Sequence, residues 1–277
     1  MKLARLLVLG CILFVCLQTQ AQNPPAQRIV ALAPHIVETL FDIGAGAQVI
    51  AAVEYSDYPQ AALALPRVGG YHGVQLEKLL ALKPDLIIVW KSGNKAADIA
   101  KMEQLKLPLA YSDAKSIDKL PEEIRYFGQL SGHQQQAEQV ALEFERDLAQ
   151  LRQTYSALPP IRTFYQLWSN PLMTVNKTTW IHQILQICGA ENVFADSATG
   201  YPQIGLENVL VSRPEVIIRP QEKSDKPQPK IDWQPWQAIP AVAKNQFVEI
   251  DADLVHRFSR RMLLGVEDMC GKLNQFR

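Results

Sequence analysis

Residues 71–90, YHGVQLEKLLALKPDLIIVW, return 130 residues later as residues 201–220, YPQIGLENVLVSRPEVIIRP. The two segments keep one register without a gap, and they share a tyrosine, two leucines, a glutamate, a proline and two isoleucines. Each copy predicts a loop, a short helix that ends before the proline, and a buried apolar strand. A repeat of this kind predicts two similar lobes related by pseudo-twofold symmetry.

A long helix is predicted between the two copies, over residues 134–155. Apolar residues follow one another there at intervals of three, four or seven, as on the buried face of an amphipathic helix, and Pro159 and Pro160 end the pattern. At 1.5 Å per residue the helix would be roughly 30–35 Å long, enough to join two lobes. The alternative is an ordinary surface helix of a single domain.

Short apolar runs alternate with helical patterns in both halves, at residues 28–33, 49–53, 86–90, 163–167 and 216–218. This alternation predicts an α/β fold with two Rossmann-like lobes and mainly parallel central sheets, joined by one long α-helix. A ligand cleft is expected between the lobes. The expected parts are an N-terminal lobe over residues 22–132, the connecting helix over 133–158 and a C-terminal lobe over 159–277.

The first 21 residues are typical of a secretory signal peptide. Lys2 and Arg5 precede an apolar run over residues 6–17, and small residues at Thr19 and Ala21 suit cleavage before residue 22. The run is too short for a membrane span, which needs roughly 20 apolar residues. The chain is therefore expected to be exported and its signal peptide removed.

The four cysteines divide between the signal peptide and the mature chain. Cys11 or Cys16 could anchor a lipoprotein, but Cys16 follows residues too large for a lipidation signal and Cys11 follows too short an apolar stretch. Cys188 and Cys270 remain after cleavage, and an oxidising compartment favours a disulfide between them over two buried free thiols. Closing this loop would stabilise the fold by about 4 kcal/mol.

Charge and motifs exclude several classes of function. Lys and Arg total 28 and so do Asp and Glu, so the chain lacks the bulk charge that attracts nucleic acid or an anionic membrane. An enzyme is not expected, because dinucleotide, phosphate-loop and nucleophile-elbow motifs are absent, although a triad assembled only in three dimensions would escape this search. The five histidines are scattered without metal-ligand spacing, so no metal site is expected.

Several aromatic residues lie at predicted strand ends. Tyr55 opens a polar loop after one strand, Trp90 ends a buried strand, and Tyr71 and Tyr201 occupy equivalent loops of the repeat. Ligands of α/β folds bind beyond strand ends, which favours a role for these rings in the cleft. Simple packing explains any one of them taken alone.

Glu77 and Glu207 open the two repeated helices. A carboxylate in the first turn is stabilised by the helix dipole whatever its function. A symmetric pair, one per lobe, also suits docking onto a symmetric dimeric partner. The two interpretations are compatible.

The mature chain resembles the vitamin B12-binding proteins of bacterial ABC importers, a solute-binding class whose lobes are joined by one long helix. The most specific motifs are residues 55–59 (YSDYP), 76–90, 170–171 (NP) and 188–194 (CGAENVF). The resemblance implies a periplasmic protein, monomeric when free, that carries cobalamin as cargo and has no resident cofactor. It also implies that Glu77 and Glu207 engage a dimeric inner-membrane permease with its ATPase subunits, and that the two cysteines form a bridge.

By the same resemblance, the ligand would be bound by Tyr55, Tyr71, Trp90, Met173, Tyr201, Asp253, Leu254, Val255, His256 and Arg257. The chain departs from the family pattern at four of these positions. Tyr71 and Tyr201 stand where tryptophan is expected, Met173 where phenylalanine is expected, and His256 where a carboxylate is expected. His256 could contact amides, approach the cobalt or remain solvated, and a contact without coordination is favoured.

A haem-binding or ferric-siderophore-binding protein of the same fold is the alternative. Siderophore sites usually contain several cleft arginines, and Arg67, Arg257, Arg260 and Arg261 could serve. In either case one stiff helix between the lobes predicts a cleft that is largely formed beforehand and closes little.

Overall fold

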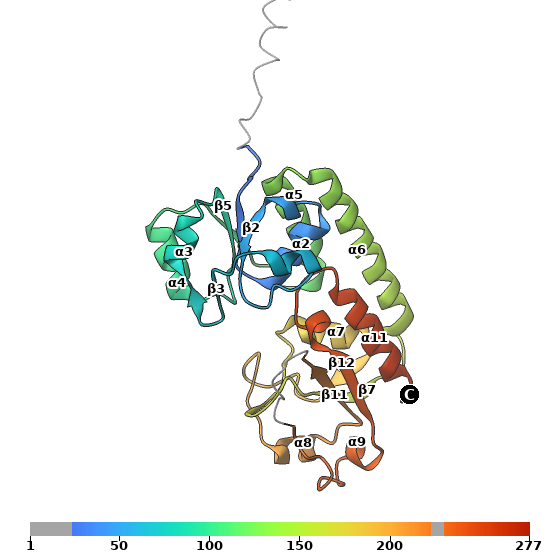
Figure 1. Ribbon diagram of the computed structural model, residues 1–277. Coiled ribbons are helices and arrows are strands. Elements are labelled where there is room, and N and C mark those ends of the chain that lie inside the picture. Colours follow the sequence, from blue (N-terminus) through green and yellow to red (C-terminus); the bar gives the residue numbers. More distant parts are fainter. Residues whose placement is uncertain (1–23, 223–229) are drawn as a thin grey trace, which may run out of the picture.

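The computed structural model describes residues 24–222 and 230–277, which form two lobes with one long helix running from the first to the second (Figure 1). The predicted signal peptide lies outside the described residues. Among the described residues, no helix is long and apolar enough to cross a membrane.

The N-terminal lobe is built on a parallel sheet in the order β2–β1–β5–β6. Helices cover both faces, so its central strands are apolar on both sides. Ile29 and Ile88 pack toward α2 and α5, whereas Val30 and Ile87 pack toward α3 and α4. The elements are β1 (Ile29–Ala31), α2 (Pro34–Asp42), β2 (Val49–Ala52), α3 (Leu76–Ala81), β5 (Leu86–Trp90), α4 (Ala96–Gln104), β6 (Leu109–Ser112) and α5 (Leu120–Ser131).

The C-terminal lobe repeats this plan with a parallel sheet in the order β10–β7–β11–β12. One face carries α7 and α11, and the other carries α8 and α9. The elements are β7 (Ile161–Tyr165), α7 (Trp180–Ile187), β10 (Ala190–Asn192), α8 (Leu206–Ser212), β11 (Val216–Gln221), α9 (Pro240–Ala243), β12 (Phe247–Asp251), α10 (Ala252–Val255) and α11 (Met262–Asn274). Strands β5 and β11 of the repeat stand third in their sheets, so the two copies occupy equivalent places in two lobes of similar topology, as the repeat predicted.

The acidic residues that follow the proline in each copy of the repeat, Asp85 and Glu215, make equivalent hydrogen bonds. Asp85 accepts a hydrogen bond from the backbone N–H of Arg28 at 2.8 Å, and Glu215 accepts one from that of Arg162 at 3.0 Å. The guanidinium groups of the same two arginines donate to carbonyls at the ends of α3 and α8, at 2.6 and 2.7 Å. These contacts satisfy orphan carbonyls at a helix end and explain why both copies carry an acidic residue directly after the proline.

Helix α6 (Gln134–Tyr155) has the bounds that the apolar periodicity predicted, and it lies within the 133–158 expected for the connecting segment. It packs against α5 in the first lobe and against α7 and α11 in the second. Its buried side belongs to one apolar cluster that continues into both lobes, through Ala137, Val140, Ala141, Phe144, Leu148 and Leu151. The helix is therefore part of a core that both lobes share. This excludes the alternative of a surface helix of one domain.

The predicted disulfide is present between Cys188, at the end of α7, and Cys270 in α11. Both residues are fully buried. The bridge ties the C-terminal helix to the second lobe across 82 residues of chain.

Candidate ligand-binding site

Three predicted aromatic residues gather at the carboxyl edge of the first sheet. Tyr55 lies in the loop after β2, Trp90 ends β5, and Tyr71 stands between the short strands β3 (Gly69–Gly70) and β4 (Gly73–Val74). The backbone N–H of Glu54 donates to the carbonyl of Gly69 at 2.8 Å, so the Tyr55 and Tyr71 loops are adjacent. Tyr55 and Tyr71 are 71% and 75% exposed, which leaves these rings free to pack on a ligand.

A second group lies on the C-terminal lobe, around Met173 in β9 (Leu172–Met173), which follows β8 (Trp168–Ser169). Met173 forms a β-bridge with Gln203, two residues after Tyr201. The bridge brings two predicted residues together. Met173 also lines a hollow of about 370 Å³, together with Leu167, Trp168, Pro171, Glu222 and His256. Trp168 is a candidate that was not predicted from the sequence, although residues 170–171 beside it were.

His256 forms a neutral hydrogen-bonded pair with a buried tyrosine. Its Nε2 lies 2.9 Å from the hydroxyl of Tyr165. Burial lowers the pKa of His256 to about 4 and, with a smaller contribution from Tyr201, raises the pKa of Tyr165. Both groups are uncharged at neutral pH, so the pair can exchange hydrogen bonds with neutral amides.

The rest of the predicted C-terminal segment faces the protein more than the cleft. Val255 is buried in the core, and Leu254 approaches α11 where Gly265 leaves room. Asp253 accepts from Arg257 at 2.8 Å. These residues hold the segment that carries His256.

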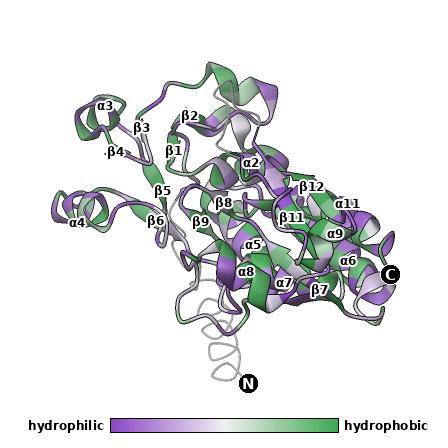
Figure 2. Cartoon of the chain, turned by 90° about the horizontal axis from the view of Figure 1, so that it is seen from below, coloured by the Kyte–Doolittle hydropathy of each residue, from purple (hydrophilic) through white to green (hydrophobic). Residues whose placement is uncertain are grey.

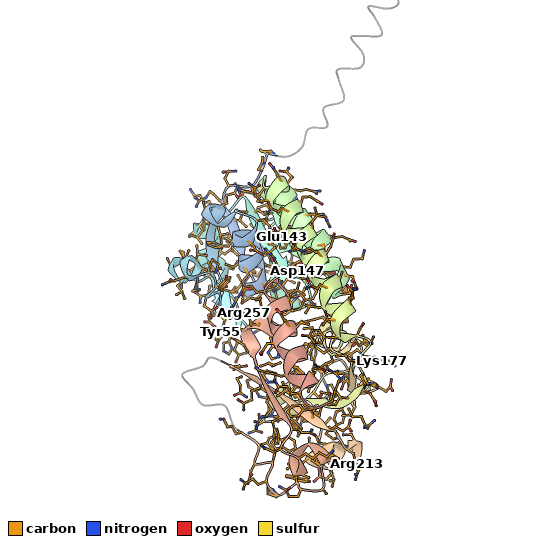
Figure 3. All side chains as sticks on the ribbon, turned by 90° about the vertical axis from the view of Figure 1, so that its right-hand side faces the viewer. Tyr55, Glu143, Asp147, Lys177, Arg213 and Arg257 are labelled. Carbon is orange, nitrogen blue, oxygen red and sulfur yellow. A yellow bond between two sulfur atoms is a disulfide. The ribbon has the colours of Figure 1, made fainter. Side chains whose placement is uncertain are left out.

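Arg257 joins the two lobes through a buried ionic cluster. Its guanidinium lies 3.0 Å from Glu38 of α2 and 2.6 Å from Asp57, two residues after Tyr55. Figure 3 shows Arg257 and Tyr55 in the region where the two lobes meet. Glu38 is 2% exposed and also accepts from Arg261 at 2.9 Å and from Ser259. Burial by itself lowers the pKa of Arg257, but hydrogen bonds to Asp57 and Glu38 raise it overall. Sequence reasoning did not identify Glu38, since its partners lie more than 200 residues away.

The four arginines considered for a siderophore all have protein partners. Arg67 donates to three backbone carbonyls, and Arg260 pairs with Glu143 at 2.7 Å. Arg261 pairs with Glu38 and lies over the ring of Tyr58, 3.5 Å from its centroid. With Arg257 in the ionic cluster, each positive charge is already bound by the protein.

Glu77 and Glu207 occupy the first turns of α3 and α8, as predicted, and both are exposed. Among the described residues, neither carboxylate forms a side-chain cap or an ion pair. Seen from below, α3 and α4 project from the body of the molecule, so the helix that carries Glu77 is open to a partner (Figure 2).

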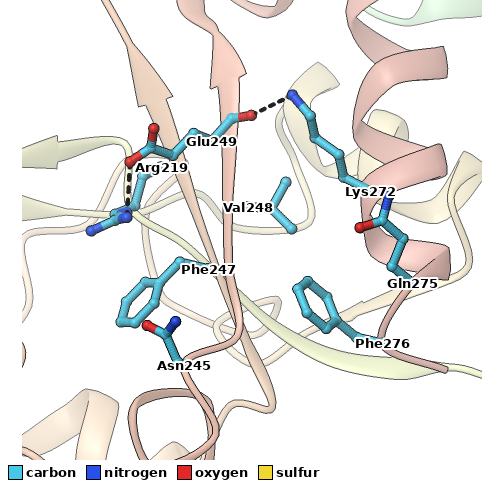
Figure 4. Close-up of a pocket in the computed structure, with 8 residues that line it drawn as sticks. All are labelled: Arg219, Asn245, Phe247, Val248, Glu249, Lys272, Gln275 and Phe276. Atoms are coloured by element: carbon cyan, nitrogen blue, oxygen red, sulfur yellow. Dashed lines mark hydrogen bonds and ion pairs between the residues drawn. The ribbon is translucent and has the colours of Figure 1, made fainter.

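A separate hollow of about 450 Å³ lies beside β12 and α11 (Figure 4). Arg219 and Lys272, its two cations, both donate hydrogen bonds to Glu249. The predicted ligand residues do not line it. Within residues 24–222 and 230–277, no group of three or more His, Cys, Asp or Glu side chains is placed to hold a metal ion.

Known proteins similar to this chain match it over nearly its whole length. The chain is 36% identical to a vitamin B12-binding protein of Vibrio vulnificus over 260 residues, which are 93% of this chain and 94% of the relative. The crystal structure of a periplasmic vitamin B12 binding protein of Vibrio cholerae matches with a TM-score of 0.84 and 36% identity, over 91% of this chain and 98% of that one. A periplasmic haem-binding protein of Roseiflexus, at 20% identity and a TM-score of 0.77 over 91% of this chain and 99% of that one, shares the fold alone. The periplasmic binding protein family model matches residues 29–254, and the chain belongs to that family.

Proposed function

We propose that this chain binds cobalamin between its two lobes and delivers it to a dimeric ABC permease of the inner membrane, which works with ATPase subunits. The observation that carries the proposal is the ion pair between Arg257 and Asp57, which brings Tyr55 of the first lobe and the Tyr165–His256 pair of the second to one junction between the lobes. The relatives at 36% identity are named as vitamin B12-binding proteins, which supports the same cargo. Cobalamin is cargo here, and no resident cofactor and no catalysis are proposed.

The charge of the site favours a corrin over the alternatives. A corrin offers broad apolar faces edged by neutral amides, which suit aromatic rings and the neutral Tyr165–His256 pair. Haem carries propionates and many ferric siderophores are anionic, so a site for either ligand needs free cationic side chains in the cleft. The arginines that could supply them are bound by carboxylates or carbonyls.

The hydrogen bond within the neutral pair also bears on whether His256 coordinates the cobalt. Its Nε2 is engaged by Tyr165, which supports hydrogen bonding to corrin amides instead of coordination of the cobalt.

We further propose that residues 1–21 direct export to the periplasm and are removed, and that the free protein is a monomer.

Delivery in this proposal begins with a cleft that closes little. Helix α6 packs on both lobes, and the buried cluster around Glu38 joins them at a second place. Glu77 and Glu207 would each dock on basic residues of one permease subunit. Docking on both lobes at once could then favour their separation and release the cargo.

Calorimetric titration of residues 22–277 with cyanocobalamin tests the cargo, with haemin and a ferric siderophore as competitors. One-to-one binding of micromolar or tighter affinity is expected for cobalamin alone. Trp90→Ala should weaken binding by about 30-fold, since buried aromatic anchors are typically worth about 2 kcal/mol. Tyr126→Ala removes a partly exposed ring from α5 and should change the affinity less than twofold. Heat with haemin or the siderophore, and none with cobalamin, would overturn the cargo.

Charge reversal tests the docking residues. The double variant Glu77→Lys, Glu207→Lys should keep cobalamin affinity within about twofold and abolish uptake in cells, because it alters contacts with the permease alone. Glu267→Lys reverses an exposed charge on α11 and serves as the matched control. Uptake that survives in the double variant, or cobalamin affinity that is lost, would contradict the assignment.

A further inference from the structure

A buried chain of three polar side chains lies behind Trp90. Nε2 of His35 is 3.0 Å from Oγ of Ser112, and Ser112 donates to a carboxylate oxygen of Glu123 at 2.8 Å. All three residues are more than nine-tenths buried, at 5%, 2% and 8% exposure. Buried polar groups cost stability unless they are paired, and these three side chains are paired with one another. An apolar core does not require them, so a function should account for their presence.

Each member of the chain comes from a different element. His35 is in the first turn of α2, Ser112 ends β6, and Glu123 belongs to α5. Ser112 is also the register partner of Trp90 across β5 and β6. Glu123 is held in place by the backbone N–H groups of Asp113 at 2.8 Å and Ala114 at 3.1 Å. The three hydrogen-bonded side chains thus lead from the fixed carboxylate of Glu123 toward the strand that ends in Trp90.

The order of protons along the chain follows from its chemistry. A serine hydroxyl has one proton, and Ser112 gives it to Glu123. Oγ of Ser112 must then accept from His35, which places the imidazole proton on Nε2. Burial lowers the pKa of His35 to about 3, so the ring stays neutral. The carboxylate therefore fixes both the tautomer and the orientation of the imidazole.

The imidazole in turn meets the indole of Trp90 edge-on, with the ring centroids 5.1 Å apart and the planes at 83°. This is a favourable geometry for an aromatic pair. Gly93 lies against the same indole, because a Cβ added there would fall 1.9 Å from it. The backbone N–H of Trp90 is also held, by Oδ1 of Asn94 at 2.8 Å. The indole has little freedom to take another rotamer.

We propose that Glu123, Ser112 and His35 are positioning residues that hold the indole of Trp90 in one orientation before the ligand arrives, and so raise the affinity of the cleft for a flat ring. The effect on affinity rests on the proposed function, because it requires that the ligand packs on Trp90. The effect on the indole itself does not. Preorganisation raises affinity because less conformational freedom is lost on binding.

The orientation of the indole is tested by fluorine NMR of the ligand-free protein labelled with 5-fluorotryptophan. The chain has five tryptophans, and Trp90→Phe assigns the resonance of interest. Ser112→Ala should shift or broaden the Trp90 resonance, and Ser112→Thr, which restores the hydroxyl, should return it. Ser131→Ala is the matched control, since Ser131 is equally buried in the same lobe and donates only to the carbonyl of Phe127.

Affinity is then measured by titration with cyanocobalamin. Ser112→Ala should bind about tenfold more weakly than wild type, and Ser131→Ala within twofold. An unmoved Trp90 resonance in both Ser112→Ala and Glu123→Gln, which keeps the side-chain volume, would overturn the proposal. A moved resonance with unchanged affinity would overturn its effect on binding. If wild type binds no cobalamin, the proposed function fails, while the NMR result still decides the role of the three residues.

Discussion

Replacing Glu38 by Gln should destabilise the protein far more than one exchanged atom suggests. The carboxylate accepts from Arg257 at 3.0 Å, from Arg261 at 2.9 Å and from Ser259, while only 2% of its side chain is exposed. Breaking a buried ion pair by removing one partner typically costs 3–5 kcal/mol. Arg257 keeps Asp57 and Asp253, so the lower end of that range applies, at about 3 kcal/mol.

Differential scanning calorimetry at neutral pH measures this loss. For chains of this size, about 3 kcal/mol corresponds to a fall in Tm of roughly 6–10 °C. Glu143→Gln is the matched control, because Glu143 forms the same kind of pair with Arg260 at 2.7 Å but both side chains are about 30% exposed. Pairs on the surface are worth about 0–1 kcal/mol, so the control should lose at most about 2–3 °C. Equal losses for the two variants would refute the claim that burial gives the Glu38 cluster its strength.

Three further predictions concern stability. Removing the disulfide with Cys188→Ala, Cys270→Ala should lower the free energy of unfolding by about 4.5 kcal/mol, the chain-entropy value for a separation of 82 residues, and chemical denaturation of the reduced wild type should agree with it. A loss under about 1 kcal/mol in both would contradict this estimate. His35 has a folded-state pKa of about 3, below its usual 6.5, so unfolding takes up a proton and stability should fall as the pH drops from about 6.5 toward 3, by on the order of 4 kcal/mol in total. Urea titrations across this range should show a shallower pH dependence for His35→Gln than for wild type, and equal slopes would count against a buried neutral imidazole. Phe144→Ala in α6 should cost about 3–5 kcal/mol because the fully buried ring belongs to the core shared by both lobes, whereas Leu142→Ala on the exposed side of the helix should change stability by less than about 0.5 kcal/mol.

The strands that the sequence predicted are those with continuous apolar runs. Strand β5 is buried on both faces over most of its length and was predicted with its observed bounds. Strands β6, β10 and β12 were not predicted, because their burial alternates and polar residues interrupt their apolar character. A period of two over three to five residues is too short to separate a strand from a loop.

The candidate site divides in the same way. The aromatic residues at strand ends could be proposed from sequence, since a strand followed by a loop fixes their place at the sheet edge. Val255 and Arg257 could not be told apart from cleft residues, because burial and pairing depend on segments far away in the chain. Trp168 and Tyr165 join the site only through the pairing of β8 with β9 and the approach of His256.

The sequence by itself determined the two-lobed plan, the connecting helix and the disulfide, because each depends on periodicity, repetition or composition along the chain. Only the tertiary structure decided which side chains meet. Glu38 and Arg257 are 219 residues apart, and His35 and Ser112 are 77 apart, yet both pairs are in contact. Such contacts depend on the order of strands in a sheet and the packing of helices on its faces, and no local pattern in the chain records either.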